Sequence, residues 1–246
     1  YYFFKQMSGR PIIFYHNFKI AKWLQLENYL CIGTLLDAVN YSNHKTIVWG
    51  TGVSGQEREF VHPQSILTVR GSLTEGFLRK YNIQCPNNYG DPALLLPRFY
   101  SPPRIEKKYI VGIIPHVLDL NIDFVNEIRK NHKEILIIDL ANYKKWTDVV
   151  DQICSCKFIL SSSLHGLIAA DAYGVPNSWI KLSNNVCGGN DFKFLDYFSA
   201  VCRKNENPIV VENMRDFEKA VEMTRYWRQP NIDIAPILNS CPFLKK

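Results

Sequence analysis

The chain has 246 residues, of which 46% are hydrophobic and 21% charged, and its formal net charge is +6. A chain of this length and composition can bury a sizeable core, as one large domain or two small ones, and it has no run of about 18 apolar residues that would predict a membrane-spanning helix. The positive charge favours anionic partners, but it is dispersed, with no Lys/Arg block and no RNA-binding aromatic motif, so we do not expect a nucleic-acid partner. A phosphorylated small molecule or an anionic membrane surface would suit the same charge.

The opening stretch and the cysteines indicate the compartment. Residues 1–16 are apolar but are interrupted by charged residues and Pro11, which is unlike a signal peptide. The seven cysteines are scattered, and only Cys154 and Cys156 lie close together. We therefore expect reduced thiols, no structural metal, and a location in the cytoplasm or at the cytoplasmic face of the membrane.

The part of the chain before residue 96 alternates apolar runs with a helical pattern. Runs at 29–36, 45–52 and 65–73 predict strands, and the stretch 74–83 predicts a helix. Residues 96–104, "LPRFYSPPR", have no periodicity and hold three prolines, so they predict a linker. We expect an N-terminal α/β lobe over residues 1–103.

The following half alternates strands and helices more clearly. The pattern predicts four strands, at 109–114, 134–140, 157–163 and 177–182, and three helices between them, at 121–131, 144–154 and 164–174. This alternation is typical of parallel βαβ units, which bind ligands at the carboxyl ends of their strands. The last helical pattern, at 211–228, is expected to pack across the lobes. The fold class is therefore α/β, with two Rossmann-like lobes, a cleft between them, and a C-terminal lobe over 104–246 that ends in a helix.

A glycine-rich turn is the first candidate binding element. "GTGVSG", residues 50–55, has the G-x-G-x-x-G spacing after a strand, but Pro63 follows early and no aspartate lies about 20 residues on, so a nicotinamide cofactor is not expected. Gly50, Thr51 and Gly52 predict either a turn that lets a ligand approach the backbone or a plain structural turn.

Two charged residues of the first lobe are further candidates. Arg70 ends an apolar run, where its planar fork could bind a carboxylate or phosphate of a ligand, and the alternative is a solvated surface arginine. Asp91, in "YGDPALLLPR", is either a turn residue that accepts from nearby amides or an acid that lines the cleft.

Two histidines follow predicted strands of the second lobe. His116 lies two residues beyond a strand, with Asp119 close behind, and its alternative is a surface loop histidine. The stretch "SSSLHGLIAADAYGVP", residues 161–176, is the strongest local signal, because its serines can cap a helix that Gly174 and Pro176 end. His165 then falls in the first helical turn, where free amides and the helix dipole favour an anion. We expect His165 to face a ligand, together with the neighbouring Ser162, Ser163 and Gly166.

At these residues the sequence resembles the polysaccharide pyruvyl transferases. The resembling segments are "VRGSLT", "YGDPALLLPRFY", "VGIIPH", "SSSLHGLIAADAYGVPNSWI" and "GGNDFKFLDYFSA". The resemblance implies a two-lobed fold like that of GT-B glycosyltransferases. It also implies transfer of pyruvate from phosphoenolpyruvate onto two hydroxyls of a saccharide, as a cyclic ketal, in capsule or exopolysaccharide biosynthesis, without metal or organic cofactor.

The resemblance also implies residue roles. Family members commonly carry an arginine just before the Leu-His-Gly triplet, a place that Ser163 holds here, so Arg70 or Lys193 is expected to supply that charge. His165, His116 and Asp91 become the candidate catalytic residues, and Asp119 joins the acceptor side. The acceptor is a saccharide, free or lipid-linked. The asparagine-glycine-aspartate element usual near the family's start is absent, so we expect a shortened first lobe or an altered acceptor side.

Two other functions remain open at this point. A nucleotide-sugar glycosyltransferase would use the same architecture, since a fold does not fix the donor. A non-catalytic protein that binds glycans or phosphosugars would account for the missing arginine. The sequence predicts no oligomeric state.

Overall fold

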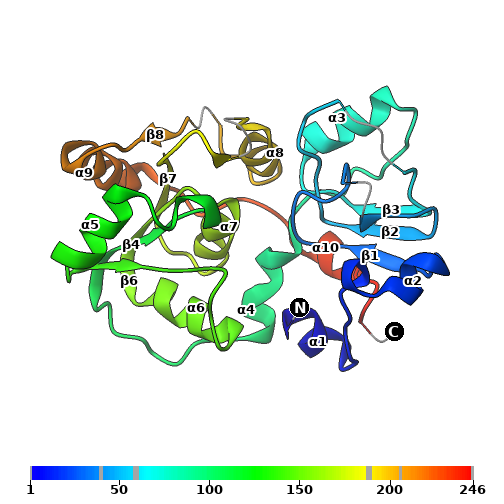
Figure 1. Cartoon of the computed structure of the whole chain (residues 1–246), viewed down its shortest axis with the longest axis horizontal. Coiled ribbons are helices and arrows are strands. Elements are labelled where there is room, and N and C mark those ends of the chain that lie inside the picture. The colour runs from blue at the N-terminus through cyan, green and yellow to red at the C-terminus, as the bar shows by residue number, and fades with distance from the viewer. Residues whose placement is uncertain (1, 39–40, 58–60, 187–189, 205–206, 245–246) are drawn as a thin grey trace. The chain divides into compact units, whose positions relative to one another are not determined.

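The structure is a computed structural model that describes residues 2–38, 41–57, 61–186, 190–204 and 207–244. The chain divides into two compact units. Unit 1 comprises Tyr1–Leu95, Asn190–Lys204 and Asn231–Lys246, and unit 2 comprises Leu96–Gly189 and Asn205–Pro230. Figure 1 labels helices and strands of both units where there is room.

This division differs from the single boundary that the sequence predicted after residue 103. The chain passes between the units at four places, because two later segments pack with the N-terminal part. The first carries α8 (Phe192–Ala200), which packs against α3 (Ser72–Lys80), and the second carries α10 (Ala235–Asn239), which packs against η3 (Pro92–Leu95). The chain first leaves unit 1 after Leu95, where the predicted linker begins, and residues Leu96–Phe99 of that linker form the short helix α4.

Unit 1 is built on a three-stranded parallel sheet in the order β1-β2-β3. Its strands are β1 (Asn28–Leu30), β2 (Thr46–Trp49) and β3 (Ser65–Thr68), and its remaining helices are α1 (Tyr2–Ser8), η1 (Tyr15–Asn17) and α2 (Lys19–Trp23). The strand predicted over 29–36 is shorter, because Gly33 adopts a φ of 127° that breaks the extended run. The core joins strand residues to the inner face of α3, with Val48, Val69 and Leu78 at 0% exposure.

Unit 2 is built on a five-stranded parallel sheet in the order β5-β4-β6-β7-β8. The strands are β4 (Tyr109–Ile114), β5 (Ile135–Ile137), β6 (Cys156–Ser161), β7 (Asn177–Lys181) and β8 (Ile209–Val210). The helices are η4 (Val117–Asp119), α5 (Asp123–Asn131), α6 (Trp146–Cys154), α7 (Leu164–Ala172), α9 (Met214–Met223) and η6 (Thr224–Tyr226). The predicted βαβ alternation and its parallel sheet are thus confirmed, whereas the two-residue strand β8 is too short to show a sequence pattern.

Helices cover both faces of this sheet. Along β4, Val111 and Ile113 point to the face covered by α5 and α9, whereas Ile114 points to the face covered by α6 and α7. Figure 1 shows α5 and α9 on the opposite side of the sheet from α6. Because strands buried on both faces cannot alternate polar and apolar residues, they appear in the sequence as continuous apolar runs, which is why they could be predicted.

The last helical pattern lies within unit 2, and only the residues after it return to unit 1. Residues 211–228 form α9 and η6 of unit 2, and the chain belongs to unit 1 from Asn231 onward. Trp227 donates through Nε1 to Asp171 at 2.8 Å, which fastens the end of this pattern to α7 of the same unit. The six cysteines among the described residues are free thiols, and Cys187 lies outside that set.

A charged cluster on α3 and the loop after it stabilises unit 1. The buried Glu75 carboxylate accepts from the Tyr89 hydroxyl and from the Arg79 guanidinium. The bond from Tyr89, and after it Arg79, holds the pKa of Glu75 below its ordinary value. In turn, burial and the bond to Glu75 raise the pKa of Tyr89 to about 12.

Candidate functional site

The loops that follow neighbouring strands of unit 2 meet at the carboxyl edge of its sheet. Ile114 of β4 pairs with Ser161 of β6, so the segments that leave the two strands run side by side. The Ser162 amide donates to the Ile114 carbonyl at 3.2 Å, and the His116 amide donates to the Ser162 hydroxyl at 2.9 Å. Two segments that lie 46 residues apart in the sequence are therefore joined at their backbones. We call this group the carboxyl-edge site; its residues are His116, Asp119, Ser161, Ser162, Ser163, His165, Gly166, Lys181 and Ser183.

Asp119 ties three of these loops together. Its carboxylate is fully buried. Oδ2 accepts from the Ser162 hydroxyl at 2.8 Å, and Oδ1 accepts from the hydroxyl of Ser183, which follows β7. A buried carboxylate that two hydroxyls engage holds the loops in place, and the substrate contact that the sequence predicted for Asp119 stays a prediction. Ser183 was missed, although a polar residue two positions beyond a strand is the signal that identified His116.

The start of α7 lies close against the sheet. The Ser161 hydroxyl accepts from the Ser163 amide at 3.0 Å and lies 2.9 Å from the Ile114 carbonyl oxygen. A Cβ on Gly166 would lie 2.3 Å from the Ser161 hydroxyl oxygen and 2.8 Å from Cγ2 of Ile114, so only glycine fits there. Ser163 is the residue before the helix, but its side chain makes no capping bond. The predicted serine cap is therefore replaced by the turn that Ser161 stabilises.

Both predicted histidines belong to this site and are half-buried. His165 is the second residue of α7, where the first-turn amides and the helix dipole favour a negative charge. His116 precedes η4, and its Nδ1 accepts from the Leu118 amide at 3.3 Å. With Nδ1 acting as the acceptor, the neutral His116 ring carries its proton on Nε2.

Lys181 is a cation of this edge that the sequence analysis did not select. It ends β7, two residues beyond Trp179, which pairs with Ser161. Because side chains alternate along a strand, and Ile180 belongs to the core under α5 and α9, Lys181 lies on the face where α7 begins. The signal that could have found it is its position at the carboxyl end of a predicted strand.

Arg70 has a different setting from the predicted one. It is fully buried in unit 1, and its Nε donates to Oδ2 of Asp196 at 2.9 Å. Nη1 donates to the Thr34 hydroxyl at 2.9 Å and to a carbonyl at 3.3 Å, and Nη2 donates to the Val53 carbonyl at 3.1 Å. Asp196 also accepts from the amide and hydroxyl of Thr74, at 2.8 and 2.7 Å. The carboxylate that this fork binds is thus internal, which corrects the prediction that it holds a ligand.

The glycine-rich turn also packs against the chain itself. A Cβ on Gly52 would lie 2.4 Å from Nη2 of Arg70, and a Cβ on Gly50 would lie 2.1 Å from Cδ of Pro92. The Thr51 side chain is buried, and its hydroxyl donates to a backbone carbonyl of unit 1 at 2.9 Å. These contacts favour the plain structural turn over the predicted ligand contact.

Asp91 and Lys193 are the remaining predicted site residues, and both are buried in unit 1. Oδ1 of Asp91 accepts from the Ala93 amide at 2.9 Å where η3 begins, which is the turn role that the sequence left open. Nζ of Lys193 lies 5.2 Å from the ring centroid of Phe194 on α8. Of the motif that precedes it, Gly188 and Gly189 lie outside the described residues.

Among the described residues, no group of three or more His, Cys, Asp or Glu side chains is arranged to bind a metal ion. In the same part of the chain, the helices are too short or too polar to cross a bilayer.

Comparison with known proteins identifies relatives of this chain. Residues 23–184 match the family described as polysaccharide pyruvyl transferase. The chain is 32% identical over 160 residues to the uncharacterized protein L143 of Acanthamoeba polyphaga mimivirus. That match covers 64% of this chain and 55% of the viral protein, so the chain spans about half the length of the curated relative it matches. No solved structure matches the chain.

Proposed function

Because the chain belongs to the polysaccharide pyruvyl transferase family, we propose that it transfers pyruvate from phosphoenolpyruvate onto two hydroxyls of a saccharide. One observation carries the proposal. The family match, residues 23–184, contains the whole carboxyl-edge site, from His116 to Ser183. The residues that the fold brings together at one edge of unit 2 are therefore part of the region that defines the family.

The reaction forms two C–O bonds at C2 of the enolpyruvyl group and breaks the bond between C2 and the phosphate oxygen. Of the two protons lost by the saccharide hydroxyls, one is added to C3, which becomes a methyl group, and the other is accounted for by the released phosphate. No oxidant or reductant is needed. The chain must supply a proton donor, a proton acceptor, and positive charge or dipoles for the anionic donor.

His165 and His116 supply the proton chemistry. Histidine is suited to this work near neutral pH, and both rings are half-buried at the carboxyl edge of the same sheet. The first turn of α7, where His165 lies, also favours the phosphate group of the donor. Asp119 fixes the His116 loop through Ser162, so it acts as a positioning residue.

Lys181 supplies the positive charge that Arg70 cannot. The Arg70 guanidinium binds Asp196 inside unit 1. Lys181 ends β7 at the carboxyl edge of the sheet of unit 2, on the face where α7 begins. In this proposal Lys181 supplies the positive charge for the donor that, in other family members, comes from an arginine at the position of Ser163.

The two compact units with parallel sheets support a GT-B-like architecture. The acceptor is a saccharide of capsule or exopolysaccharide synthesis, and the free thiols of the described cysteines support a cytoplasmic setting.

The test is to incubate the purified chain with phosphoenolpyruvate and a panel of galactose-, glucose- and mannose-containing acceptors, both soluble and lipid-linked. The expected product is an acceptor heavier by one pyruvate unit less one water, with one phosphate released for each product formed. A hexose increment that appears only with nucleotide sugars would contradict the proposal in favour of a glycosyltransferase. Tight binding of phosphoenolpyruvate without any product over the whole panel would contradict it in favour of a binding protein.

A further inference from the structure

A surface segment of unit 1 combines exposed apolar side chains with positively charged residues. We define the 10–26 segment as residues 10–26, which include η1 and α2. Seven of its large hydrophobic side chains are exposed: Ile13 (65%), Phe14 (61%), Phe18 (40%), Ile20 (60%), Trp23 (81%), Leu24 (47%) and Leu26 (43%). Large apolar side chains gathered on one surface mark a site of interaction with a protein or a membrane.

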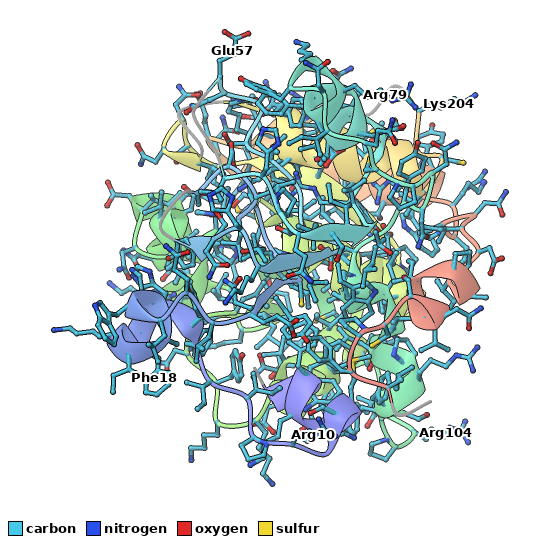
Figure 2. All side chains as sticks on the ribbon, turned by 90° about the vertical axis from the view of Figure 1, so that its right-hand side faces the viewer. Arg10, Phe18, Glu57, Arg79, Arg104 and Lys204 are labelled. Carbon is cyan, nitrogen blue, oxygen red and sulfur yellow. The ribbon has the colours of Figure 1, made fainter. Side chains whose placement is uncertain are left out.

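The charge of the segment has one sign. Arg10, Lys19 and Lys22 are its charged residues, and the first acidic residue of the chain is Glu27, just beyond it. Ile20 and Trp23 of α2, together with Leu24, which follows the helix as its C-cap, have the i, i+3, i+4 spacing of one helix face, and all three side chains are exposed. Lys19 lies beside this face and is exposed, Lys22 is half-buried on the other side of the helix, and Ala21 is buried. Figure 2 labels Phe18 beside α2 and Arg10 after α1.

The 10–26 segment is held to the rest of unit 1 by hydrogen bonds and ring stacking, although its apolar side chains are exposed. Asn43, which is buried, donates through Nδ2 to the Leu26 carbonyl at 2.9 Å and to the Tyr15 hydroxyl at 2.6 Å. The His16 ring stacks on Tyr41, with 4.6 Å between the ring centroids. The segment is thus fastened to unit 1 while its apolar side chains face outward.

From these observations we infer that the 10–26 segment docks unit 1 onto an anionic lipid surface. Tryptophan and phenylalanine beside lysine and arginine, with no acidic residue, form the composition that binds at the interface of anionic bilayers. Lysine is depleted in protein–protein interfaces, whereas at a membrane its aliphatic stem lies along the apolar side chains and its ammonium group contacts the lipid headgroups. The described helices cannot cross a bilayer, so the contact is a peripheral one.

This contact goes beyond the proposed reaction and would give it a location. Only its use in presenting a lipid-linked acceptor rests on the proposed function; binding to lipid does not. A vesicle assay without donor or acceptor therefore tests the inference separately from pyruvyl transfer.

The experiment is cosedimentation of the full chain with vesicles of phosphatidylglycerol and phosphatidylcholine, compared with pure phosphatidylcholine. We expect binding to the anionic vesicles only, weakened by added salt. Each lysine near an anionic surface strengthens binding about fivefold, so Lys19→Glu/Lys22→Glu should bind at least about 25-fold more weakly. Trp23→Ala should lose about tenfold or more, the effect of withdrawing one large buried apolar side chain.

Unit 2 offers matched controls. Lys130→Glu/Lys133→Glu repeats the spacing of the paired lysines on exposed residues, and Tyr226→Ala removes an aromatic side chain that is 63% exposed. Both should bind anionic vesicles like the unaltered chain. Equal binding by Trp23→Ala and the unaltered chain, or equal binding to neutral and anionic vesicles, would overturn the inference. A concentration-dependent dimer that Trp23→Ala abolishes, with no vesicle binding, would assign the surface to a second copy of the chain instead.

Discussion

Replacing Arg70 by methionine should destabilise unit 1 strongly. The substitution removes the ion pair with Asp196 and the hydrogen bonds to the Thr34 hydroxyl and to two backbone carbonyls. The side chains of Arg70 and Asp196 are both fully buried. Asp196 would keep the two bonds from Thr74 but remain as a buried charge without a counter-ion. Removing one partner of such a pair costs about 3–5 kcal/mol. For a chain of this size, the melting temperature should therefore fall by roughly 6–20 °C.

Calorimetry on a small set of variants tests this value. Arg70→Lys keeps the charge but loses the fork, so it should cost less, about 1–3 kcal/mol. In Arg70→Met/Asp196→Leu both charges are gone, and the double variant should be more stable than the sum of its single substitutions predicts. As a control, Arg225→Met removes an ion pair with Glu222 in which both side chains are exposed, and it should leave the melting temperature nearly unchanged. A Lys variant that melts like the unaltered chain but binds phosphoenolpyruvate more weakly would refute the structural role and restore the ligand role.

Three further predictions concern other parts of the structure. Gly166→Ala should lower the melting temperature, because the new Cβ would lie 2.3 Å from the hydroxyl oxygen of Ser161 at the end of β6. The control Gly76→Ala, on the exposed face of α3, places its Cβ where nothing lies within 4 Å, so it should raise the free energy of unfolding by about 0.5–1 kcal/mol. Equal effects of the two substitutions in calorimetry would contradict the close approach of α7 to the sheet. The pKa of Glu75 is lowered in the folded chain, so its stabilising effect is complete above the ordinary carboxyl pKa and is lost as the pH falls through the folded value. Glu75→Gln should therefore lower the melting temperature at neutral pH, with the difference shrinking in acid, and a pH-independent difference would count against the ionised carboxylate. Lys181→Met should raise the KM for phosphoenolpyruvate, whereas Lys157→Met, at the opposite end of the sheet, should not; steady-state kinetics with equal KM values would remove Lys181 from the donor site.

The fold of unit 2 could be predicted because its strands are buried on both faces. Each forms a continuous apolar run, and the polar residues that follow adjacent parallel strands must meet at one edge. This is how the sequence alone placed His116 and Ser162 each at the carboxyl end of a strand, although it did not predict the hydrogen bond between them. The role of His165 stays a prediction, because no ligand contact tests it.

The errors arise where a residue's partner is remote in the sequence. Arg70 at the end of a strand has the same local pattern whether it faces a ligand or Asp196, which lies 126 residues further on. The glycines of the turn after β2 likewise indicate close approach without saying what approaches, and here it is Arg70 and Pro92. The return of α8 to unit 1 could not be predicted either, since it packs against α3 through bonds between residues as remote in the sequence as Thr74 and Asp196.

The central claim is that the carboxyl edge of unit 2 carries pyruvyl transfer. The most direct test is the rate of phosphate release from phosphoenolpyruvate, with and without a saccharide acceptor, by the unaltered chain and by His165→Ala, with the melting temperature of each recorded. The account predicts release that depends on the acceptor in the unaltered chain, and its loss in His165→Ala at a nearly unchanged melting temperature. Acceptor-dependent release that continues undiminished in the folded His165→Ala variant would contradict it.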